Sequence, residues 1–398
     1  MTSVVIVGGG VIGLSIAWRA AQAGMSVTLA DPAPGRGASH AAAGMLAPAA
    51  EAAYAEKDLF ALGLRSLRRF AGFSSELTEL TGLPTGFRQA GTLQVAYDAD
   101  DMSVLIEAQE LQDSFGMATS RLSARECRAA EPMLDPAVRG GVLTEEEGAA
   151  DPRLLIAALL AAAQRCGAAL VPERVTEILY SEPPGRGPEP ASVEPAARPG
   201  QRVSGIRLAS GRTVPCEWVV IAAGWESSAI AGMPPDALPP IRPVKGQILR
   251  LRASGDALLP GRCIRGLVRG ARVYLLPREN RELVVGATQE ELGPDVTVTA
   301  GGVWELLRDA HSLVPGITEL EFAEATAGLR PGTPDNAPVL GPAGPPGLVL
   351  ATGHFRGGVL LAPVTAELTT EYLHTQRLPA PAAPFTVHRL HGPDGSRP

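Results

Sequence analysis

The sequence predicts an α/β fold in which a Rossmann-like domain is joined to a second, antiparallel β-sheet-rich (α+β) domain. Residues 1–31 follow the order strand, glycine turn, helix and strand, which is how a doubly wound parallel sheet begins. Residues 241–288 contain several runs with strand-like alternation, a pattern typical of antiparallel pairs. With 398 residues, the chain is also long enough for two domains.

The first strand is predicted at Val4–Val7, where an apolar and β-branched run suits a buried parallel strand. Ile12–Ala23 has the pattern of a helix with small residues on its sheet-facing side, and Gly24 ends it. Ser26–Ala30 is predicted to be the second strand, with Asp31 at its C-terminal end. Together these elements predict a βαβ nucleotide-binding unit.

Gly8, Gly10 and Gly13 form a G-x-G-x-x-G motif between the first strand and the helix. Gly8 permits a tight turn, Gly10 lets the backbone approach a pyrophosphate, and Gly13 lets helix and strand pack closely. The helix N-terminus offers N–H groups to phosphates, and Asp31 can accept hydrogen bonds from ribose hydroxyls. The acid disfavours NADP, and this stretch alone leaves both FAD and NAD open.

Residues 32–51 read PAPGRGASHAAAGMLAPAAE, and the part from Ala38 to Ala50 consists almost entirely of small residues. Small side chains let a backbone approach a large flat ligand closely. The alternative is a flexible Ala/Gly linker. Because the stretch directly follows the dinucleotide motif, we expect it to form a surface against which a ring system packs. This favours FAD.

The next elements are predicted from periodicity and from helix stop and start signals. Asp151 is placed as the N-cap of a helix whose first residue is Pro152. The predicted helices are Leu59–Thr81, Ser103–Phe115, Ser123–Ala130 and the one from Pro152 to Cys166. The predicted strands are Phe87–Tyr97, Gly140–Thr144, Ala169–Val175 and Thr176–Ser181.

A Pro-, Gly- and Glu-rich insertion occupies residues 182–201, between two strand-like runs at Val175–Tyr180 and Val203–Leu208. We expect these runs to pair and the insertion to be a flexible loop at the tip of their hairpin. Further on, a helix is predicted at Gly302–Leu313. The strands predicted in this part are Glu217–Gly224, Ile241–Arg252, Arg272–Pro277, Glu282–Thr288 and Phe322–Leu329.

A second glycine turn, Thr352–Gly358, follows the strand Leu348–Ala351 and precedes a helix at Val359–Leu373. A helix N-terminus aimed at the N1/C2=O edge of a flavin would stabilise the charge that forms there on reduction. The alternative is an ordinary loop. The last twenty residues or so are rich in Pro and Ala and predict a loosely held tail.

This order predicts a discontinuous FAD-binding domain with two insertions that form the substrate-binding domain. The FAD-binding domain is expected to comprise residues 1–85, 146–225 and 325–398, and the substrate-binding domain residues 86–145 and 226–324.

Composition excludes several classes of protein. The net charge of −7 provides neither a basic face for nucleic acid nor attraction to anionic membranes. The scattered cysteines contain no CxxC, so neither a zinc site nor a disulfide framework is expected. The N-terminal apolar run is broken by glycines, unlike a signal peptide, and no run has the length of a membrane span. We therefore expect a cytoplasmic protein without a metal; its cysteines are Cys127, Cys166, Cys216 and Cys263.

Arg330, Arg356 and Tyr274 are candidates for a clamp on the carboxylate of an amino acid, since arginine binds carboxylates in a fork and tyrosine can add a donor. The alternatives are surface ion pairs for the arginines and a core position for the tyrosine. His354 and His40 are candidate proton carriers, but anchoring a turn is an equally good role for each. Neither a catalytic triad nor a paired-carboxylate site is indicated.

The sequence resembles the glycine oxidases of the D-amino-acid oxidase family. The resemblance covers Val4 to Thr369 and rests on VVIVGGGVIGLSIAW, GASHAAAGMLAPAAE, PVKGQILRL, VYLLPRENRELVVGAT, AGLRPGTPDNAPVLG and ATGHFRGGVLLAPVTAELT. It implies a two-domain fold, non-covalent FAD and oxidation of an amine next to a carboxylate.

Carried over by position, the resemblance assigns Arg330, Tyr274 and Arg356 to binding and orienting the substrate carboxylate. It assigns further residues to FAD, beyond Gly8, Gly10 and Gly13 of the motif. These are Val11, Ile12, Asp31, Pro32, Ala38, Ser39, Ala43, Gly44, Met45, Val175, His354, Phe355, Arg356, Gly357, Gly358, Val359 and Leu360. Related sarcosine oxidases attach flavin to a cysteine before a TPD-like segment. Here Gly328, Leu329 and Arg330 precede Thr333–Asp335, which disfavours covalent attachment.

The implied reaction is oxidative deamination of glycine, sarcosine or small D-amino acids to a 2-oxo acid, ammonia and hydrogen peroxide. A hydride moves to flavin N5 and O2 reoxidises the flavin. The resemblance also implies a homotetramer and a link to the thiazole branch of thiamine synthesis. The alternatives are a D-amino-acid dehydrogenase that reduces a quinone and a flavoprotein whose FAD is not catalytic.

Overall fold

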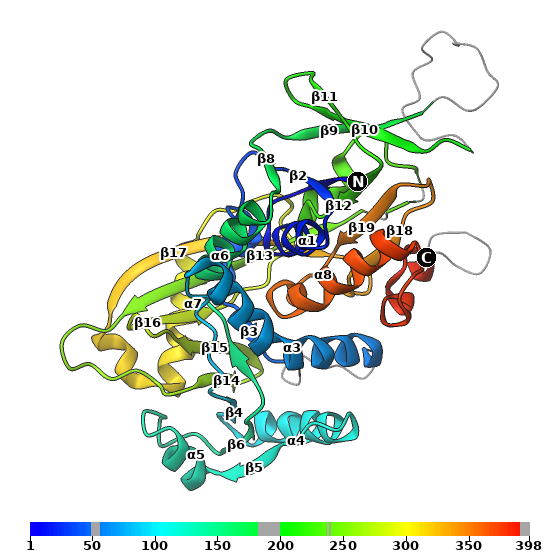
Figure 1. Ribbon diagram of the computed structural model, residues 1–398. Helices are drawn as coiled ribbons and strands as arrows, with labels where there is room; N and C mark the ends of the chain where they lie inside the picture. Colours follow the sequence, from blue (N-terminus) through cyan, green and yellow to red (C-terminus); the bar gives the residue numbers. More distant parts are fainter. Residues whose placement is uncertain (49–55, 182–199, 236, 239, 391–398) are drawn as a thin grey trace.

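The computed structural model describes residues 1–48, 56–181, 200–235, 237, 238 and 240–390. A six-stranded sheet forms the centre of one part of the molecule (Figure 1). All neighbouring strands in it are parallel except the first pair. In spatial order its strands are β18 (Val339–Pro342), β19 (Leu348–Thr352), β12 (Trp218–Ile221), β1 (Ser3–Val7), β2 (Ser26–Ala30) and β8 (Ala169–Val171).

The alternation of β1 determines what covers each face of this sheet. Val4 and Ile6 pack with four helices, whereas Val5 and Val7 pack with a small three-stranded sheet, because successive side chains of a strand point to opposite faces. The helices are α1 (Val11–Gln22), α3 (Lys57–Thr81), α6 (Pro152–Arg165) and α8 (Gly358–Thr375). The small sheet contains β11 (Thr213–Pro215), β10 (Val203–Leu208) and β9 (Val175–Tyr180).

An eight-stranded, mostly antiparallel sheet forms the second part of the molecule. Its one parallel neighbour pair is β14 with β4. In spatial order the strands are β17 (Glu321–Gly332), β13 (Arg242–Arg252), β16 (Glu282–Gly286), β15 (Ala271–Pro277), β14 (Cys263–Val268), β4 (Thr92–Ala96), β6 (Gly140–Thr144) and β5 (Ser120–Ser123).

The remaining described elements cover the large sheet or connect the two parts. Leu306, Ala310 and Leu313 of α7 pack on the large sheet in one apolar cluster. Figure 1 shows α4 and α5 beside β5 and β6, at the opposite end of the molecule from β9–β11. These elements are α2 (Ala38–Ala41), β3 (Met45–Leu46), α4 (Ala99–Ser114), α5 (Ala124–Ala130), β7 (Gly148–Ala149), α7 (Ala300–Leu313), η2 (Gly224–Ala229), η3 (Pro315–Glu319), η4 (Ala380–Phe385) and η5 (Val387–Leu390).

The predicted fold class is confirmed: the chain combines a parallel sheet flanked by helices with an antiparallel sheet-rich second part. Asp151 is the N-cap of α6, as expected, and its side chain accepts a hydrogen bond from the N–H of Arg153 at 2.9 Å. The hairpin of β9 and β10 is also confirmed. Residues 182–199 of the predicted flexible loop lie outside the described residues.

Two expectations need correction. The last twenty residues are not a loose tail as far as residue 390, because Phe385, Val387 and Leu390 are buried against the six-stranded sheet region. The predicted strand Phe322–Leu329 is longer, so that Arg330 lies within β17 and pairs with Val244 instead of following the strand. The predicted domain division stays a prediction, and its boundary at residue 325 falls within β17.

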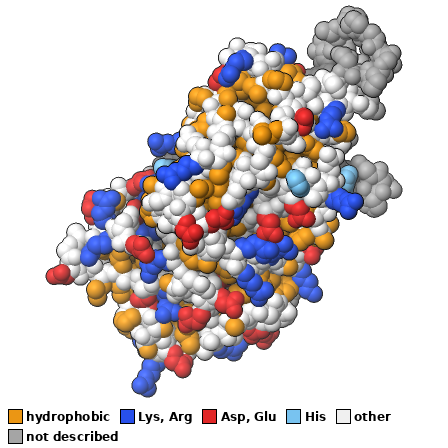
Figure 2. Space-filling view, viewed as in Figure 1, with side chains coloured by type: hydrophobic (Ala, Val, Ile, Leu, Met, Phe, Trp, Pro, Cys, Tyr) orange, Lys and Arg blue, Asp and Glu red, His pale blue; other side chains and the backbone are white. Residues whose placement is uncertain are grey.

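Both charge signs are distributed over the surface. Figure 2 shows acidic and basic side chains interspersed across the face in view. Within the described ranges, no helix combines the length and apolar composition needed to cross a membrane.

Candidate active site

A cavity of about 900 Å³ opens between the carboxyl ends of the parallel strands and one face of the eight-stranded sheet. Ligands of open α/β sheets bind at this edge. Every residue predicted to contact FAD or substrate lines this cavity, except Gly13, which lies behind the lining. Their contacts with a ligand stay predictions, but the fold gathers them around one space.

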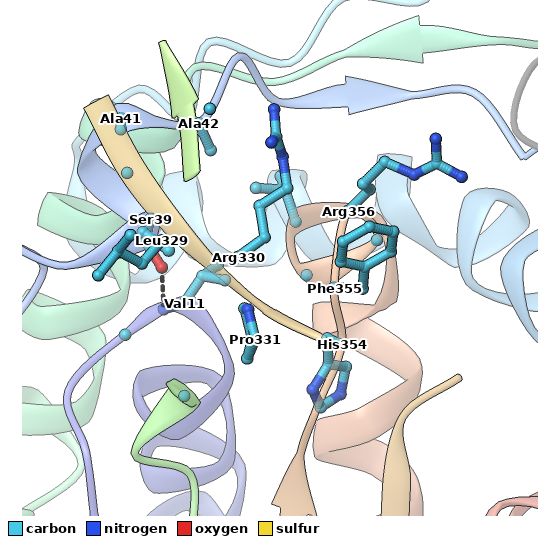
Figure 3. Close-up of a pocket in the computed structure, with 18 of the residues that line it drawn as sticks. Val11, Ser39, Ala41, Ala42, Leu329, Arg330, Pro331, His354, Phe355 and Arg356 are labelled. Atoms are coloured by element: carbon cyan, nitrogen blue, oxygen red, sulfur yellow. Dashed lines mark hydrogen bonds between the residues drawn. The ribbon is translucent and has the colours of Figure 1, made fainter. Parts of the chain in front are cut away.

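The first glycine turn forms one end of the cavity. Gly8 has a φ of +106°, and a Cβ there would lie 2.5 Å from the carbonyl oxygen of Ala222, which follows β12. The turn therefore requires glycine. Gly10 precedes α1 as its N-cap, and the Val11 N–H donates to Ser39 Oγ at 3.1 Å (Figure 3). The positive end of the α1 dipole thus faces the cavity, where an anion is stabilised.

Asp31 ties the chain after β2 to this turn. Its carboxylate accepts hydrogen bonds from the N–H of Gly9 at 2.6 Å and from the N–H of Ala33 at 2.7 Å. A carboxylate offers about four acceptor positions, so these two bonds leave acceptor capacity for ribose hydroxyls. Asp31 therefore positions the glycine turn, and its contact with a ribose stays a prediction.

The small-residue stretch forms a wall of the cavity, as far as it is described (Ala38 to Pro48). Ala41, Ala43 and Gly44 are buried, and α2 packs against β17. A Cβ at Gly328 of β17 would lie only 2.7 Å from the Ala41 Cβ. The backbones of α2 and β17 thus approach each other closely because both residues are small. A large side chain at either position would not fit between them. Ala49 and Ala50 of the predicted surface lie outside the described residues.

The second glycine turn is anchored by its histidine. His354 is buried, and its Nε2 lies 3.0 Å from Thr365 Oγ1. Burial lowers the pKa of His354 to about 3, so the ring is neutral at physiological pH. The Phe355 N–H donates to the Pro331 carbonyl at 3.0 Å and joins the turn to β17. These contacts favour the anchoring role of His354 over proton transfer.

His40 does not line the cavity. Its pKa is lowered, first by burial and then by the nearby charge of Arg153. The N-terminus of α8, by contrast, does face the cavity through Gly358 and Val359. Its first turn contains no acidic residue, so its dipole offers a positive end to a ligand.

The side chains of Arg330 and Tyr274 line the cavity, and each lies over a glycine of a neighbouring strand. The Arg330 Nη1 donates to the carbonyl oxygens of Lys245 at 3.3 Å and Thr288 at 3.1 Å. A Cβ at Gly246 would overlap the Arg330 guanidinium, and a Cβ at Gly286 would overlap the Tyr274 hydroxyl. The sheet thus leaves both side chains room to lie flat over its surface.

The strand register shows that these two groups share one face. Tyr274 pairs with Gly286, and Gly286 pairs with Ile248 of β13. Directly paired residues point to the same face of a sheet, and so do residues two apart in a strand. Gly246 is two residues before Ile248, so the guanidinium over Gly246 and the hydroxyl over Gly286 lie on the cavity face.

Arg356 lines the cavity, but its side chain does not lie against that of Arg330. Its side chain is exposed, and its guanidinium carbon lies 5.1 Å from the ring centroid of Phe355. In Figure 3 the ends of the Arg330 and Arg356 side chains point apart. Of the three residues predicted to form a clamp, Arg330 and Tyr274 thus lie on one face of the cavity and Arg356 lies apart from them, and their contact with a carboxylate stays a prediction.

The structure adds residues that the sequence analysis did not single out. Gln94 of β4 and Arg265 of β14 pair with each other, and Arg265 pairs with Tyr274, so all three face the cavity. The pairing of β4 with β14 joins segments about 170 residues apart and leaves no local sequence signal. Gly246 could have been identified from the sequence, because the alternation of PVKGQILRL places it on the same face as Ile248.

Behind the clamp, a buried lysine holds β13. Lys245 Nζ lies 2.6 Å from Asp295 Oδ2 and 3.0 Å from Glu290 Oε2. The ammonium lowers the pKa of Asp295 to about 2. Because the carbonyl of the same lysine accepts from Arg330, this ion-pair cluster fixes the backbone that orients the guanidinium. Across the described part of the chain, no group of three or more His, Cys, Asp or Glu residues could hold a metal ion.

Comparisons with known proteins agree with this geometry. The family profile described as FAD dependent oxidoreductase matches residues 3–372. A glycine oxidase of Geobacillus kaustophilus is 30% identical over 395 residues, which is 98% of each chain. The crystal structure of glycine oxidase from that organism superposes on this chain with a TM-score of 0.85, and the match covers 98% of this chain and 100% of the other.

Longer relatives also match. A bifunctional protein ThiO/ThiG of Nostoc sp. is 33% identical over 375 residues. The match includes 94% of this chain but 53% of that protein, so the chain spans about half the length of these curated relatives.

Proposed function

This chain belongs to the FAD-dependent oxidoreductase family, and from that membership we propose that it oxidises glycine, and also sarcosine and small D-amino acids, at the Cα–N bond. The observation that carries the proposal is the pair of Arg330 and Tyr274 on one cavity face, each over a glycine. An arginine fork and a phenol hydroxyl match the carboxylate shared by these substrates.

The cavity fits FAD by its chemistry. Gly8 and Gly44 have positive φ, and a Cβ at either would meet backbone of the neighbouring segment. The N-termini of α1 and α8 offer positive dipole ends at two separate places. We assign the pyrophosphate to the turn of Gly8–Gly13 and the ring system to the small-residue wall and the second turn. When bound, FAD supplies a two-electron acceptor for a hydride.

The residues of the chain position the substrate. Arg330 binds both carboxylate oxygens, Tyr274 donates its hydroxyl hydrogen to one of them, and this fixes the direction of the Cα–H bond. The substrate amine reacts in its neutral form, whose electron pair forms the imine as the hydride leaves. Water hydrolyses the imine to a 2-oxo acid and an amine, which is ammonia from glycine and methylamine from sarcosine, and O2 takes up the two electrons as hydrogen peroxide. Neutral His354, bonded to Thr365, has no part in these steps.

The test is a peroxide assay of the purified holoenzyme with glycine, sarcosine, D-alanine and D-proline. We expect turnover with at least one of them and equal formation of ammonia from glycine. Reduction of a quinone analogue without peroxide would support the D-amino-acid dehydrogenase instead. A protein that binds FAD but turns over none of the four substrates with either acceptor would refute the proposal.

We also propose that the glycine imine feeds the thiazole branch of thiamine synthesis, which the ThiO/ThiG relatives support by name. The gene is expected to restore growth without thiamine to a bacterial strain that lacks its own glycine oxidase step. An Arg330→Lys variant is the matched control and should restore growth poorly. Equal growth with this variant and with wild type would argue against the link.

A further inference from the structure

A second cavity, of about 410 Å³, lies between the eight-stranded sheet and the start of α6, and it shares no lining residue with the first. Its lining residues come from the start of α6 and from β13, β15 and β16, among other segments. Five arginines and three acids line it, and Glu324, just outside the lining, forms an ion pair with Arg153 at 2.7 Å. The arginines are Arg88, Arg153, Arg250, Arg262 and Arg278.

Arg250 is the most buried of these arginines, with 1% of its side chain exposed. Its Nη1 donates to Glu282 Oε1 at 2.5 Å, whereas its Nε and Nη2 have no hydrogen-bond partner among the described residues. The closest acid to Nε is Glu324, at 3.8 Å. The residue is therefore held in place by one acid while two donor nitrogens stay unsatisfied.

Two further arginines add unsatisfied donors to the same cavity. Arg278 donates from Nη1 to the Ala150 carbonyl at 2.9 Å and from Nη2 to the Ala43 carbonyl, but its buried Nε lacks a described partner and lies 3.8 Å from Asp151. Arg262 Nη1 is also buried without a hydrogen bond, 3.7 Å from Glu145. Three guanidinium groups thus present four buried, unsatisfied nitrogens.

Such an arrangement is costly unless an acceptor enters. A buried donor without an acceptor destabilises the folded state, and more so when the donor is charged. A guanidinium presents its N–H groups in a planar fork that matches the oxygens of a carboxylate or phosphate.

We propose that this cavity binds a small molecule through a carboxylate or phosphate group held by Arg250, Arg262 and Arg278. The volume admits more than the oxyanion itself, so the remainder of the ligand lies against the apolar part of the lining, which includes Cys263 and Leu276. Arg278 connects this site with the first cavity, because the same guanidinium holds the Ala43 carbonyl in the small-residue wall.

The experiment is thermal unfolding of the FAD-loaded enzyme in rising concentrations of sodium phosphate or sodium acetate, with ionic strength kept constant by sodium chloride. At an anion concentration about tenfold above Kd, Tm is expected to rise by roughly 2 °C, and above Kd it should go on rising with the logarithm of the anion concentration. The two arms distinguish a phosphate from a carboxylate ligand. If neither anion raises Tm above the value in sodium chloride of the same ionic strength, the proposal is overturned.

Four variants test whether the rise in Tm comes from anion binding in this cavity. Arg250→Lys keeps a positive charge beside Glu282 but lacks the fork, and Arg262→Gln removes a partly exposed donor, so both should lose the rise. Arg252→Gln changes an exposed arginine of the same strand outside the lining and should keep it. Arg330→Lys should also keep it.

The Arg330 variant separates this cavity from the candidate active site, where carboxylates are also expected to bind. A loss of the rise in Arg330→Lys, or an unchanged rise in Arg262→Gln, would refute the assignment. Because Arg262 is partly exposed, its variant serves as the test if Arg250→Lys does not fold.

Discussion

Arg330 is oriented by the backbone beneath it. Two carbonyl oxygens, of Lys245 and Thr288, accept from the same nitrogen of its guanidinium, and the absence of a side chain at Gly246 lets the group lie against the sheet. The Lys245 ion pairs hold the underlying strand. The position of the guanidinium thus depends on several fixed contacts, so that little side-chain entropy remains to be lost when a carboxylate binds.

Arg330→Lys should weaken substrate binding. An ammonium group keeps the charge but cannot donate two parallel hydrogen bonds to one carboxylate. We expect the apparent KM for glycine to rise roughly tenfold or more, which corresponds to about 1.4 kcal/mol, as measured by steady-state peroxide formation. Arg252→Lys is the matched control on β13. An unchanged KM would remove Arg330 from the carboxylate site.

His354 predicts a pH dependence of stability. Burial lowers its pKa from 6.5 to about 3, so the unfolded chain takes up a proton at acidic pH that the folded chain excludes. The resulting contribution to the free energy of unfolding is present in full above pH 6.5 and is lost as pH falls towards 3. At pH 5 the loss amounts to roughly 2 kcal/mol.

The matching experiment compares His354→Gln with wild type by urea unfolding at pH 7.5 and pH 5. Glutamine can still bond to Thr365 but does not titrate. Wild type should lose roughly 2 kcal/mol more than the variant over this interval. Parallel losses in the two proteins would show that His354 is not buried in its neutral form.

Elements defined by local signals could be predicted from the sequence, whereas long-range pairings could not. The βαβ unit around Gly8 and the Asp151 cap are encoded by neighbouring residues. The extension of β17 through Pro331 could not be anticipated, because proline usually ends a strand; here β17 is an edge strand, where a missing N–H is tolerated. The same holds for the site. The glycine turns could be recognised in the sequence, but the strand register that places Arg265 beside Tyr274 could not.

Gly13→Ala tests the packing between α1 and β1. An added Cβ would overlap the Gly8 carbonyl, a backbone atom that cannot rotate away. The helix would have to move from the strand, at a cost of about 1–3 kcal/mol, and the glycine turn would move with it. We expect a lower Tm and roughly tenfold weaker FAD binding, measured by flavin fluorescence during reconstitution.

Gly72→Ala is the control for this variant, because Gly72 lies within α3 and an added Cβ meets nothing within 4 Å. It should leave FAD affinity unchanged and keep or raise Tm. If Gly13→Ala binds FAD as tightly as Gly72→Ala, the close approach of α1 to β1 is not needed for the cofactor.

At the scale of the whole molecule, two sheets from interleaved parts of the chain share one cavity. The turn of Gly8–Gly13 lies near one end of the sequence and the turn of His354–Gly358 near the other, yet both line it. Arg330 and Tyr274 come from the other sheet. A ligand in this cavity therefore contacts both parts, and its binding is expected to stabilise their arrangement by linkage.

The same architecture bears on how the flavin is retained. None of the four cysteines lines the cavity as far as the chain is described. Burial raises the pKa of Cys127 to about 11 and those of Cys216 and Cys263 to about 12, which keeps these thiols in their unreactive form. His354 is engaged with Thr365. These observations support the prediction that hydrogen bonds, helix dipoles and packing hold FAD without a covalent bond.

We therefore expect the purified protein to be yellow and to release its flavin into the supernatant when it is precipitated with acid or unfolded in a chaotrope. Absorbance spectra of supernatant and pellet measure the partition, and addition of FAD to the refolded apoprotein should restore the bound spectrum. Flavin that stays with the denatured chain would indicate a covalent bond. A colourless protein that cannot be reconstituted would contradict the assignment of this cavity to FAD, because the glycine turns, the small-residue wall and both helix N-termini would then lack the ligand that their arrangement fits.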